Sequence, residues 1–290
     1  MAFRRSAVGV SLLLVAAVVA AGLALQQGPT IAANALLHPW RKTAVPPAPD
    51  GCEDVRLAGM DVALSGWRCR AAGDAVATAI LLHGIADNRG SWSGTIPWLL
   101  HKRFEVIAYD SRANGESEGS ACTYGFLEKQ DLHRVIDTLE VRPIVLIGTS
   151  LGAAIALQEA ADDPRVVAVV AAETFSDLRT IAIERAPFYF PRFMVPGAFA
   201  LAEQQGGFRI DDVSPVRAAA SIRAAVLVIH GADDVDTRPD HSRRVYDALA
   251  GRKRLIMIVG GRHNQSLSSP ETWNEIDRWI DENSRLHPQE

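Results

Sequence analysis

Gly148-Thr149-Ser150-Leu151-Gly152 is a G-x-S-x-G sequence whose surroundings decide the fold. The apolar run Ile144–Ile147 directly before it predicts a buried strand, and the spacing of Ala153–Ala160 directly after it predicts a helix. A serine at the apex of a strand, a tight turn and a helix is a nucleophile elbow, which exposes the hydroxyl on a strained turn. The flanking residues are glycines because larger side chains would clash where the strand and the helix approach each other. Ser150 is therefore the predicted nucleophile.

Apolar runs alternate with helical patterns on both sides of the elbow. The predicted strands are Ala77–Leu82, Val106–Tyr109, Ile144–Ile147, Val166–Ala172, Ala225–Ile229 and Leu255–Val259. The predicted helices are Leu127–Leu139, Ala153–Ala160, Ser242–Leu249 and Thr272–Ile280. Strands that are apolar throughout and separated by helices predict an α/β fold, with a mostly parallel central sheet and helices on both faces. Such a sheet carries its chemistry in loops at the carboxyl ends of the strands.

The interval Asp177–Asp212 interrupts this alternation. It is rich in aromatic residues and prolines, among them Phe188, Tyr189 and Pro191, and it is too long for a connecting loop. We expect a small helical cap over the strand ends at about residues 177–212, and an apolar cap beside a site usually shapes a binding pocket. The alternative is a surface excursion that packs its own aromatic side chains.

A serine hydroxyl needs a histidine as general base, and with a nucleophile elbow the chain order is serine, acid, histidine. Three candidate histidines follow Ser150. His263 lies in a glycine-rich loop directly after the last predicted strand, where it can reach over the elbow. His230 is still on its strand and is expected to be structural, and His241 falls early in a helix and is expected to be solvated. His263 is the predicted base.

Spacing alone does not choose the carboxylate that orients this histidine. The loop after Ala225–Ile229 and the start of the next helix carry four aspartates, and most exposed aspartates are simply solvated. A further carboxylate, Glu173, ends an earlier predicted strand. The four aspartates are Asp233, Asp234, Asp236 and Asp240.

Four segments together resemble the α/β-hydrolase family over roughly residues 50–285. Besides the elbow, the segments are Leu82-His83-Gly84-Ile85, the turn from Tyr109 to Ser117, and His230-Gly231-Ala232-Asp233-Asp234. The turn is similar to the family's D-x-R-x-x-G-x-S sequence, with Ala113 where glycine is usual. Tyr124–Asp131 is similar to the segment that follows in lipase-like and serine-aminopeptidase-like members.

The resemblance implies roles for particular residues. In the family's H-G-x-x-D segment the aspartate is the triad acid, which is Asp234 here, with Asp233 as the runner-up and Glu173 as a remote third. The amide that follows the H-G glycine is one oxyanion donor, which is the Ile85 N–H, and His83 is expected to be structural. The second expected donor is the Leu151 N–H, which is free at the start of its helix.

The implied activity is serine hydrolysis of a small-molecule acyl substrate. We expect a carboxylic ester, with a lipid-like acyl chain under the cap as one option, and no metal or organic cofactor. A serine peptidase of the aminopeptidase-like type and a non-catalytic membrane-tethered scaffold remain alternatives. A dehalogenase is disfavoured because its nucleophile would be an aspartate at position 150. The net charge of −4 offers no basic field for nucleic acid, and the oligomeric state is left open.

The N-terminus predicts a membrane segment within residues 1–25. Arg4 and Arg5 precede the uncharged, mostly apolar stretch from Ala7 to Leu25. This is long enough to span a bilayer, whereas a secretory apolar region is usually shorter, so we favour an anchor over a cleaved signal peptide. The two arginines favour a cytoplasmic N-terminus, which places the catalytic domain outside the cytoplasm, or makes it secreted if the segment is cleaved. Residues 26–50 are expected to be a proline-rich tether, and 51–290 the hydrolase domain.

Two of the three cysteines are expected to pair. Cys52 and Cys69 flank two predicted short strands that turn near Gly59-Met60, so their side chains would lie within disulfide reach. In an oxidising compartment they should be joined, and the alternative is two unrelated thiols. Cys122 has no obvious partner, and no cysteine or histidine spacing suggests zinc.

Overall fold

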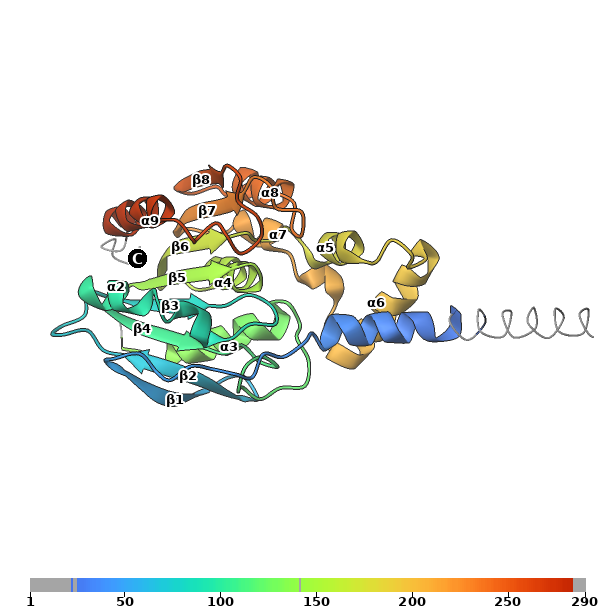
Figure 1. Ribbon diagram of the computed structural model, residues 1–290, viewed down its shortest axis with the longest axis horizontal. Helices are drawn as coiled ribbons and strands as arrows, with labels where there is room; N and C mark the ends of the chain where they lie inside the picture. Colours follow the sequence, from blue (N-terminus) through green and yellow to red (C-terminus); the bar gives the residue numbers. More distant parts are fainter. Residues whose placement is uncertain (1–21, 23–24, 141, 284–290) are drawn as a thin grey trace, which may run out of the picture.

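The computed structural model describes residues 22, 25–140 and 142–283, and in it the apolar runs pair as an eight-stranded sheet (Figure 1). The strands are β1 (Cys52–Ala58), β2 (Ala63–Cys69), β3 (Ala77–Leu82), β4 (Phe104–Tyr109), β5 (Ile144–Thr149), β6 (Val166–Ala172), β7 (Ala225–Gly231) and β8 (Lys253–Ile258). Their order across the sheet is β1-β2-β4-β3-β5-β6-β7-β8. The pairs β1–β2 and β2–β4 are antiparallel, and the remaining pairs are parallel. The predicted mostly parallel sheet is confirmed.

Helices cover both faces of the sheet, because the central strands are apolar on both. One face packs against α3 (Phe126–Asp137), α4 (Leu151–Asp162), α7 (Pro215–Ala219) and α8 (Asp240–Ala248). The other packs against the 3-10 turn η1 (Arg89–Trp92), α2 (Ile96–His101) and α9 (Pro270–Asn283). The strands β3, β4, β6 and β7 have no exposed residue. This is the layered α/β architecture that uninterrupted apolar strands predict.

The first two strands are linked covalently. Cys52 lies opposite Cys69 in the β1–β2 register, and their sulfurs form a disulfide. Cys122 is a buried free thiol, and burial raises its pKa well above the ordinary value. The disulfide thereby joins the two ends of the edge hairpin that lie farthest from its turn.

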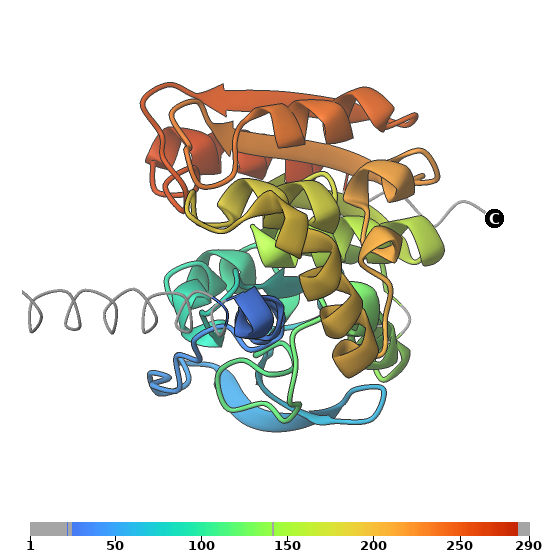
Figure 2. The ribbon, with the colours of Figure 1, turned by 90° about the vertical axis from the view of Figure 1, so that its right-hand side faces the viewer.

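The interval 177–212 is largely helical and projects beyond the sheet (Figures 1 and 2). It contains α5 (Leu178–Arg185), the 3-10 turn η2 (Arg192–Met194), α6 (Val195–Gly206) and the 3-10 turn η3 (Ile210–Asp212). Its aromatic side chains divide into two groups. Phe199 and Phe208 share a buried cluster with residues from outside the cap, whereas Phe188 and Tyr189 are exposed and contact each other.

The segment expected to be a tether begins instead with a helix. Residues 25–37 are helical, and Ala33 and Leu37 are fully buried in the cluster that includes Phe199 and Phe208 of the cap. The helix forms because its apolar side chains have a partner surface there, which sequence periodicity alone could not show. The predicted membrane segment lies almost wholly outside the described residues. Among those described, no helix has both the length and the apolar character needed to cross a bilayer.

Candidate active site

Ser150 lies in the tight turn between β5 and α4. Its backbone φ is 51° and ψ is −110°, a strained conformation for a residue with a side chain. The turn is possible only because of its glycines. A Cβ on Gly148 would overlap the backbone of Gly152, and a Cβ on Gly152 would overlap the Leu82 carbonyl at the end of β3. The predicted strand–turn–helix geometry is therefore the one observed.

The structure brings Ser150, His263 and Asp234 together from three loops. His263 Nε2 lies 3.2 Å from Ser150 Oγ, and His263 Nδ1 lies 2.7 Å from Asp234 Oδ2. An ionised aspartate can only accept, so Nδ1 carries the proton and Nε2 is free to accept from the serine hydroxyl. The side chain of His263 is 10% exposed and that of Asp234 is buried. A base oriented by a buried carboxylate, in contact with a hydroxyl, is the arrangement that activates a nucleophile.

Asp234 is held as a carboxylate by its neighbours. Its Oδ1 accepts from the N–H groups of Asp236 and Thr237, both at 2.9 Å. Its Oδ2 lies 3.2 Å from His230 Nε2 in addition to the contact with His263. Burial opposes ionisation, yet the hydrogen bonds from His230, His263 and Thr237 lower the pKa of Asp234 below its ordinary value. In the folded protein Asp234 is therefore ionised at neutral pH.

The other two candidate histidines are buried and serve the fold. His230 Nδ1 contacts Ser242 Oγ at 2.6 Å, and its Nε2 contacts the Thr237 carbonyl at 2.8 Å. The loop that carries Asp234 is thus tied to α8, in agreement with a structural role for His230.

The expectation of a solvated His241 is wrong. The side chain is fully buried: Nδ1 accepts from the Ser176 N–H at 3.1 Å, and Nε2 donates to Glu184 at 3.0 Å. Burial lowers the pKa of His241. The helical position suggested exposure, but α8 packs against the start of the cap, and no local pattern reveals that contact.

The two alternative acids do not contact the histidine ring as Asp234 does. Asp233 is exposed. Glu173 is buried, and its nearest carboxylate oxygen lies 3.7 Å from His263 Nδ1. Its oxygens are instead bonded to the N–H groups of Asn264, Gln265 and Ser266 in the loop that carries His263. Through these three hydrogen bonds Glu173 fixes the position of the loop that carries His263.

The loop after β3 orients the Ile85 amide. The Gly84 carbonyl accepts from Asp87 N–H at 3.3 Å and from His83 Nδ1 at 2.7 Å, while His83 Nε2 accepts from the Ser111 N–H at 3.0 Å. Burial lowers the pKa of His83, so the ring is neutral. In a trans peptide the C=O and the following N–H point in opposite directions. The Ile85 N–H therefore faces away from the His83 ring. Gly84 itself lies close to the elbow, since a Cβ on it would lie 3.7 Å from Ser150 Cβ.

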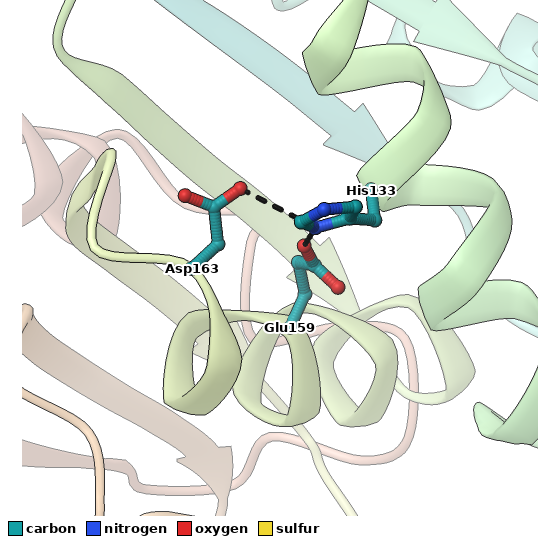
Figure 3. Close-up of side chains that lie close together, drawn as sticks. All are labelled: His133, Glu159 and Asp163. Atoms are coloured by element: carbon teal, nitrogen blue, oxygen red, sulfur yellow. Dashed lines mark hydrogen bonds and ion pairs between the residues drawn. The ribbon is translucent and has the colours of Figure 1, made fainter.

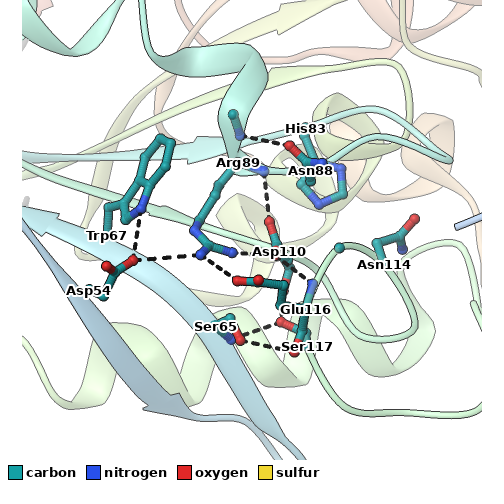
Figure 4. Close-up of polar contacts among 12 residues, drawn as sticks. Asp54, Ser65, Trp67, His83, Asn88, Arg89, Asp110, Asn114, Glu116 and Ser117 are labelled. Carbon is teal, nitrogen blue, oxygen red and sulfur yellow. Dashed lines mark hydrogen bonds and ion pairs between the residues drawn. The ribbon is translucent and has the colours of Figure 1, made fainter. Parts of the chain in front are cut away.

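A buried ion pair between Arg89 and Asp110 supports the turn that follows β4 (Figure 4). Asp110 accepts from the Arg89 N–H at 2.7 Å, and its other oxygen lies 2.5 Å from the Arg89 guanidinium. The same oxygen accepts from the Glu116 N–H at 2.8 Å. Asp110 and Arg89 are both buried. The turn that resembles D-x-R-x-x-G-x-S is thus a structural support, as expected, and Ala113 takes a positive φ of 58° where glycine is usual.

The Leu151 N–H opens α4 beside Ser150. Neither this N–H nor that of Ile85 has an acceptor among the described residues. Free amides at a helix start carry part of the positive end of the helix dipole. Both residues line the apolar cavity together with Ser150.

Two cavities meet at Ser150. A polar one of about 620 Å³ is lined by charged residues such as Glu184, Asp236 and Arg238. An apolar one of about 770 Å³ extends between the cap and residues 25–36. Ser150, Ile85 and Arg185 line both. A segment before residue 50 forms part of the wall of the apolar cavity, which the sequence did not indicate. The segment lies there because its helix packs against the cap, and the cap is more than a hundred residues further along the chain.

A separate cluster joins α3 to α4 (Figure 3). His133 Nδ1 lies 2.8 Å from Glu159 Oε1 and 3.6 Å from Asp163 Oδ2. These three side chains could converge on a metal ion, but both oxygens of Asp163 already accept from the guanidinium of Arg165. The adjacent fixed cation disfavours a metal, so the cluster is a polar contact between two helices, with Arg165 and Asp163 as its ion pair.

The chain is similar to known proteins over most of its length. A family model described as the α/β hydrolase fold matches residues 79–213. The uncharacterized protein YfhR of Escherichia coli strain K12 is 30% identical over 253 residues, which cover 83% of this chain and 83% of YfhR.

Solved structures share the architecture. The esterase Pf2001 of Pyrococcus furiosus superimposes with a TM-score of 0.69 at 21% identity, over 84% of this chain and 99% of the esterase. An acylaminoacyl peptidase of Pyrococcus horikoshii superimposes with a TM-score of 0.65 at 15% identity, over 82% of this chain and 42% of the peptidase. At these identities the likeness concerns the fold alone.

Proposed function

This chain belongs to the α/β-hydrolase family, and from that premise we propose that it is a serine hydrolase that cleaves a carboxylic ester through Ser150. The observation that carries the proposal is the continuous chain of contacts from Asp234 through His263 to Ser150 Oγ, at 2.7 and 3.2 Å. Ser150 lines both cavities and His263 lines the polar one, so a substrate bound there would meet the hydroxyl and its base.

In the first step His263 Nε2 takes the proton of Ser150 as Oγ attacks the acyl carbon. The ring then carries a positive charge, which Asp234 stabilises through Nδ1–H. When the tetrahedral intermediate collapses, the imidazolium returns the proton to the departing alcohol. The acyl group remains on Ser150 as an ester.

In the second step water replaces the alcohol. His263 removes a proton from the water as its oxygen attacks the acyl-enzyme, and the proton then passes to Ser150 Oγ as the acid leaves. The amides of Ile85 and Leu151 are the proposed donors to the oxyanion in both steps. Each such donor is worth about 3 kcal/mol of barrier.

The apolar cavity favours an apolar acyl chain. Its walls include Phe175, Phe199, Met194 and Ala198, and it opens at Ser150. An acyl chain placed there would leave the alcohol in the polar cavity. A peptidase is the nearest alternative, and the carboxylates of Glu184 and Asp236 in the polar cavity would suit a substrate amine.

Labelling with a fluorophosphonate probe tests whether the chain is an enzyme. We expect wild-type protein to be labelled and Ser150→Ala to be unlabelled. An unreactive wild type with a cooperative unfolding transition would instead support the non-catalytic scaffold.

A substrate panel then separates the two hydrolytic alternatives. We expect hydrolysis of p-nitrophenyl acyl esters and little turnover of aminoacyl anilides. The reverse preference would identify a peptidase.

The membrane anchor and the extracytoplasmic position of the catalytic domain remain part of this proposal. The Cys52–Cys69 disulfide supports an oxidising compartment, since such bonds are rare in the cytosol. The intact mass of the mature protein tests the anchor: retention of residues 1–25 supports it, and their loss identifies a cleaved signal peptide.

A further inference from the structure

The helical stretch 25–37 and α6 lie side by side and run in the same direction. A Cβ on Gly197 would lie 3.6 Å from Pro29, and a Cβ on Gly206 would lie 3.0 Å from the Leu37 side chain. The Leu37 carbonyl accepts from the Cys122 N–H at 2.8 Å, so this end of the helix is attached to the body of the protein. The other end lies beside the loop between α5 and α6 (Figure 1).

That loop presents large apolar side chains to solvent. Phe188 is 99% exposed, and Tyr189 and Phe193 are each 73% exposed. Ile31 on the adjacent helix is 65% exposed. We call these four residues the apolar tip. Phe188 and Tyr189 contact each other, and Tyr189 and Ile31 line the same cavity. Single exposed apolar side chains are common on proteins, but a group of them in one region marks an interaction surface.

The apolar cavity connects this tip to the site. Its lining includes Ile85, Ser150 and Leu151 from the site, and it also includes Tyr189 and Ile31 of the tip. Phe188 and Phe193 do not line the cavity. An apolar chain of sufficient length could therefore reach from the tip to Ser150.

The charge pattern around the tip points to one kind of partner. Residues 186–202 contain a single charged residue, Arg192, and no acid. The chain enters the helical stretch 25–37 at the tip, and the sequence before that point, Ala7–Leu25, is uncharged. Exposed aromatic side chains with a cationic neighbour and no acid are typical of surfaces that insert into the headgroup region of a membrane.

We propose that the apolar tip docks on the surface of a lipid bilayer and that acyl chains pass from the bilayer into the cavity. The second half of the proposal rests on the proposed ester hydrolysis at Ser150. A chain that moves directly from lipid to an apolar cavity is never exposed to water, so no hydrophobic cost opposes its transfer. The ester then reaches Ser150 with its alcohol directed to the polar cavity.

Hydrolysis in vesicles tests the passage of substrate. The full-length chain is reconstituted in phosphatidylcholine vesicles that contain a long-chain acyl ester, and p-nitrophenyl acetate serves as the soluble substrate. We expect Phe188→Asp and Phe193→Asp each to lower the rate on the vesicle ester roughly tenfold, since each replaces an apolar ring that would insert into the headgroup region with a charge. The acetate rate should change by less than about twofold, because neither side chain lines the cavity. Val76→Asp, at the amino end of β3 and 43% exposed, is the matched control and should affect neither rate.

Equal losses on the two esters would overturn the proposal, because the tip would then act on the site itself. An unchanged vesicle rate in both variants would overturn it as well. Failure of the proposed function has a different signature, since the wild-type chain would then cleave neither ester.

A label tests docking without any turnover. Phe188→Cys and Val76→Cys each add one accessible thiol, because Cys52 and Cys69 are bonded and Cys122 is buried. A fluorophore at position 188 should be quenched by nitroxide-bearing lipids, and one at position 76 should not. Equal quenching at the two positions would refute docking at the tip.

Discussion

The buried carboxylate of Glu173 accepts a hydrogen bond from the Ser266 N–H at 3.0 Å, across 93 residues of chain. The Ser266 hydroxyl donates to the same oxygen. Glu173 has a positive φ of 56°, and so has Asn264, at 63°. One carboxylate thus links two backbone positions with positive φ, and the loop that it binds carries His263, whose Nε2 contacts Ser150 Oγ at 3.2 Å. Glu173 is a positioning residue for the histidine loop.

Glu173→Gln should lower kcat on a soluble ester by about ten- to a hundredfold, with little change in KM. An amide in place of the carboxylate presents N–H donors to the loop's own N–H groups, so His263 loses its fixed position. Steady-state kinetics over a pH series measures the effect. Asp233→Asn, which removes an exposed carboxylate from the neighbouring loop, is the control and should retain activity. A Glu173→Gln variant with wild-type kcat would refute the positioning role.

Asp234→Asn should reduce kcat by about 10⁴-fold and leave the fold intact. The amide would favour the wrong histidine tautomer and would not stabilise the imidazolium. Fluorophosphonate labelling rates and ester kinetics measure this. If activity survives in Asp234→Asn but not in Glu173→Gln, then Glu173 is the acid after all.

Asp234 also predicts how acid affects stability. Its pKa is lowered in the folded protein, so the folded state binds fewer protons than the unfolded state as the pH approaches the ordinary aspartate value. Its contribution to stability is therefore complete above about pH 4 and is lost as the pH falls further. Denaturant unfolding from pH 7 to pH 3 should show a smaller loss in Asp234→Asn than in wild type.

Glu159 should produce the opposite dependence. Burial raises its pKa to about 7, although the hydrogen bond from His133 opposes the shift. The folded state therefore holds a proton that the unfolded state releases, and stability falls as the pH rises from about 4.5 to 7. Glu159→Gln should remove this slope and be more stable than wild type at pH 8, by about 1–3 kcal/mol. Glu140→Gln, on an exposed side chain, is the control for denaturant melts at pH 5 and pH 8.

Reduction of the Cys52–Cys69 disulfide should lower the free energy of unfolding by about 3 kcal/mol, as for other loops of this size. Urea unfolding with and without a reductant measures the change. Cys52→Ala/Cys69→Ala should match the reduced wild type and respond no further to reductant. Equal stability of the oxidised and reduced proteins would contradict a stabilising role.

Ala182→Phe should shift the chain-length preference toward short acyl groups. Ala182 lies on α5 and lines the apolar cavity, so the added ring would fill part of the space proposed for the acyl chain. We expect kcat/KM for a decanoate ester to fall at least about fivefold more than for an acetate ester, in line with lost apolar contact. The measurement is the ratio of kcat/KM for decanoate to kcat/KM for acetate, compared between the variant and the wild type. An unchanged ratio would place the acyl chain elsewhere.

Much of the architecture could be predicted because the signals are local. The observed bounds of Ala77–Leu82 and Val166–Ala172 match the predicted strands, since strands buried on both faces are apolar without interruption. The sequence did not predict the short helix α2 (Ile96–His101), because its 6 residues are too few to show a helical period.

Local sequence was enough to predict the elbow at Ser150, the α/β class and His263 as the base, because these depend on periodicity, on chain order and on glycines that only close backbone approach requires. The packed structure then established that Asp234, as the family resemblance implied, and not Glu173 contacts the His263 ring. It also showed that His241 is buried and that residues from the helical stretch 25–37 line the apolar cavity. Each of these depends on contacts between segments far apart in the chain. Such contacts are set by how whole layers pack, and no short stretch of sequence contains that information.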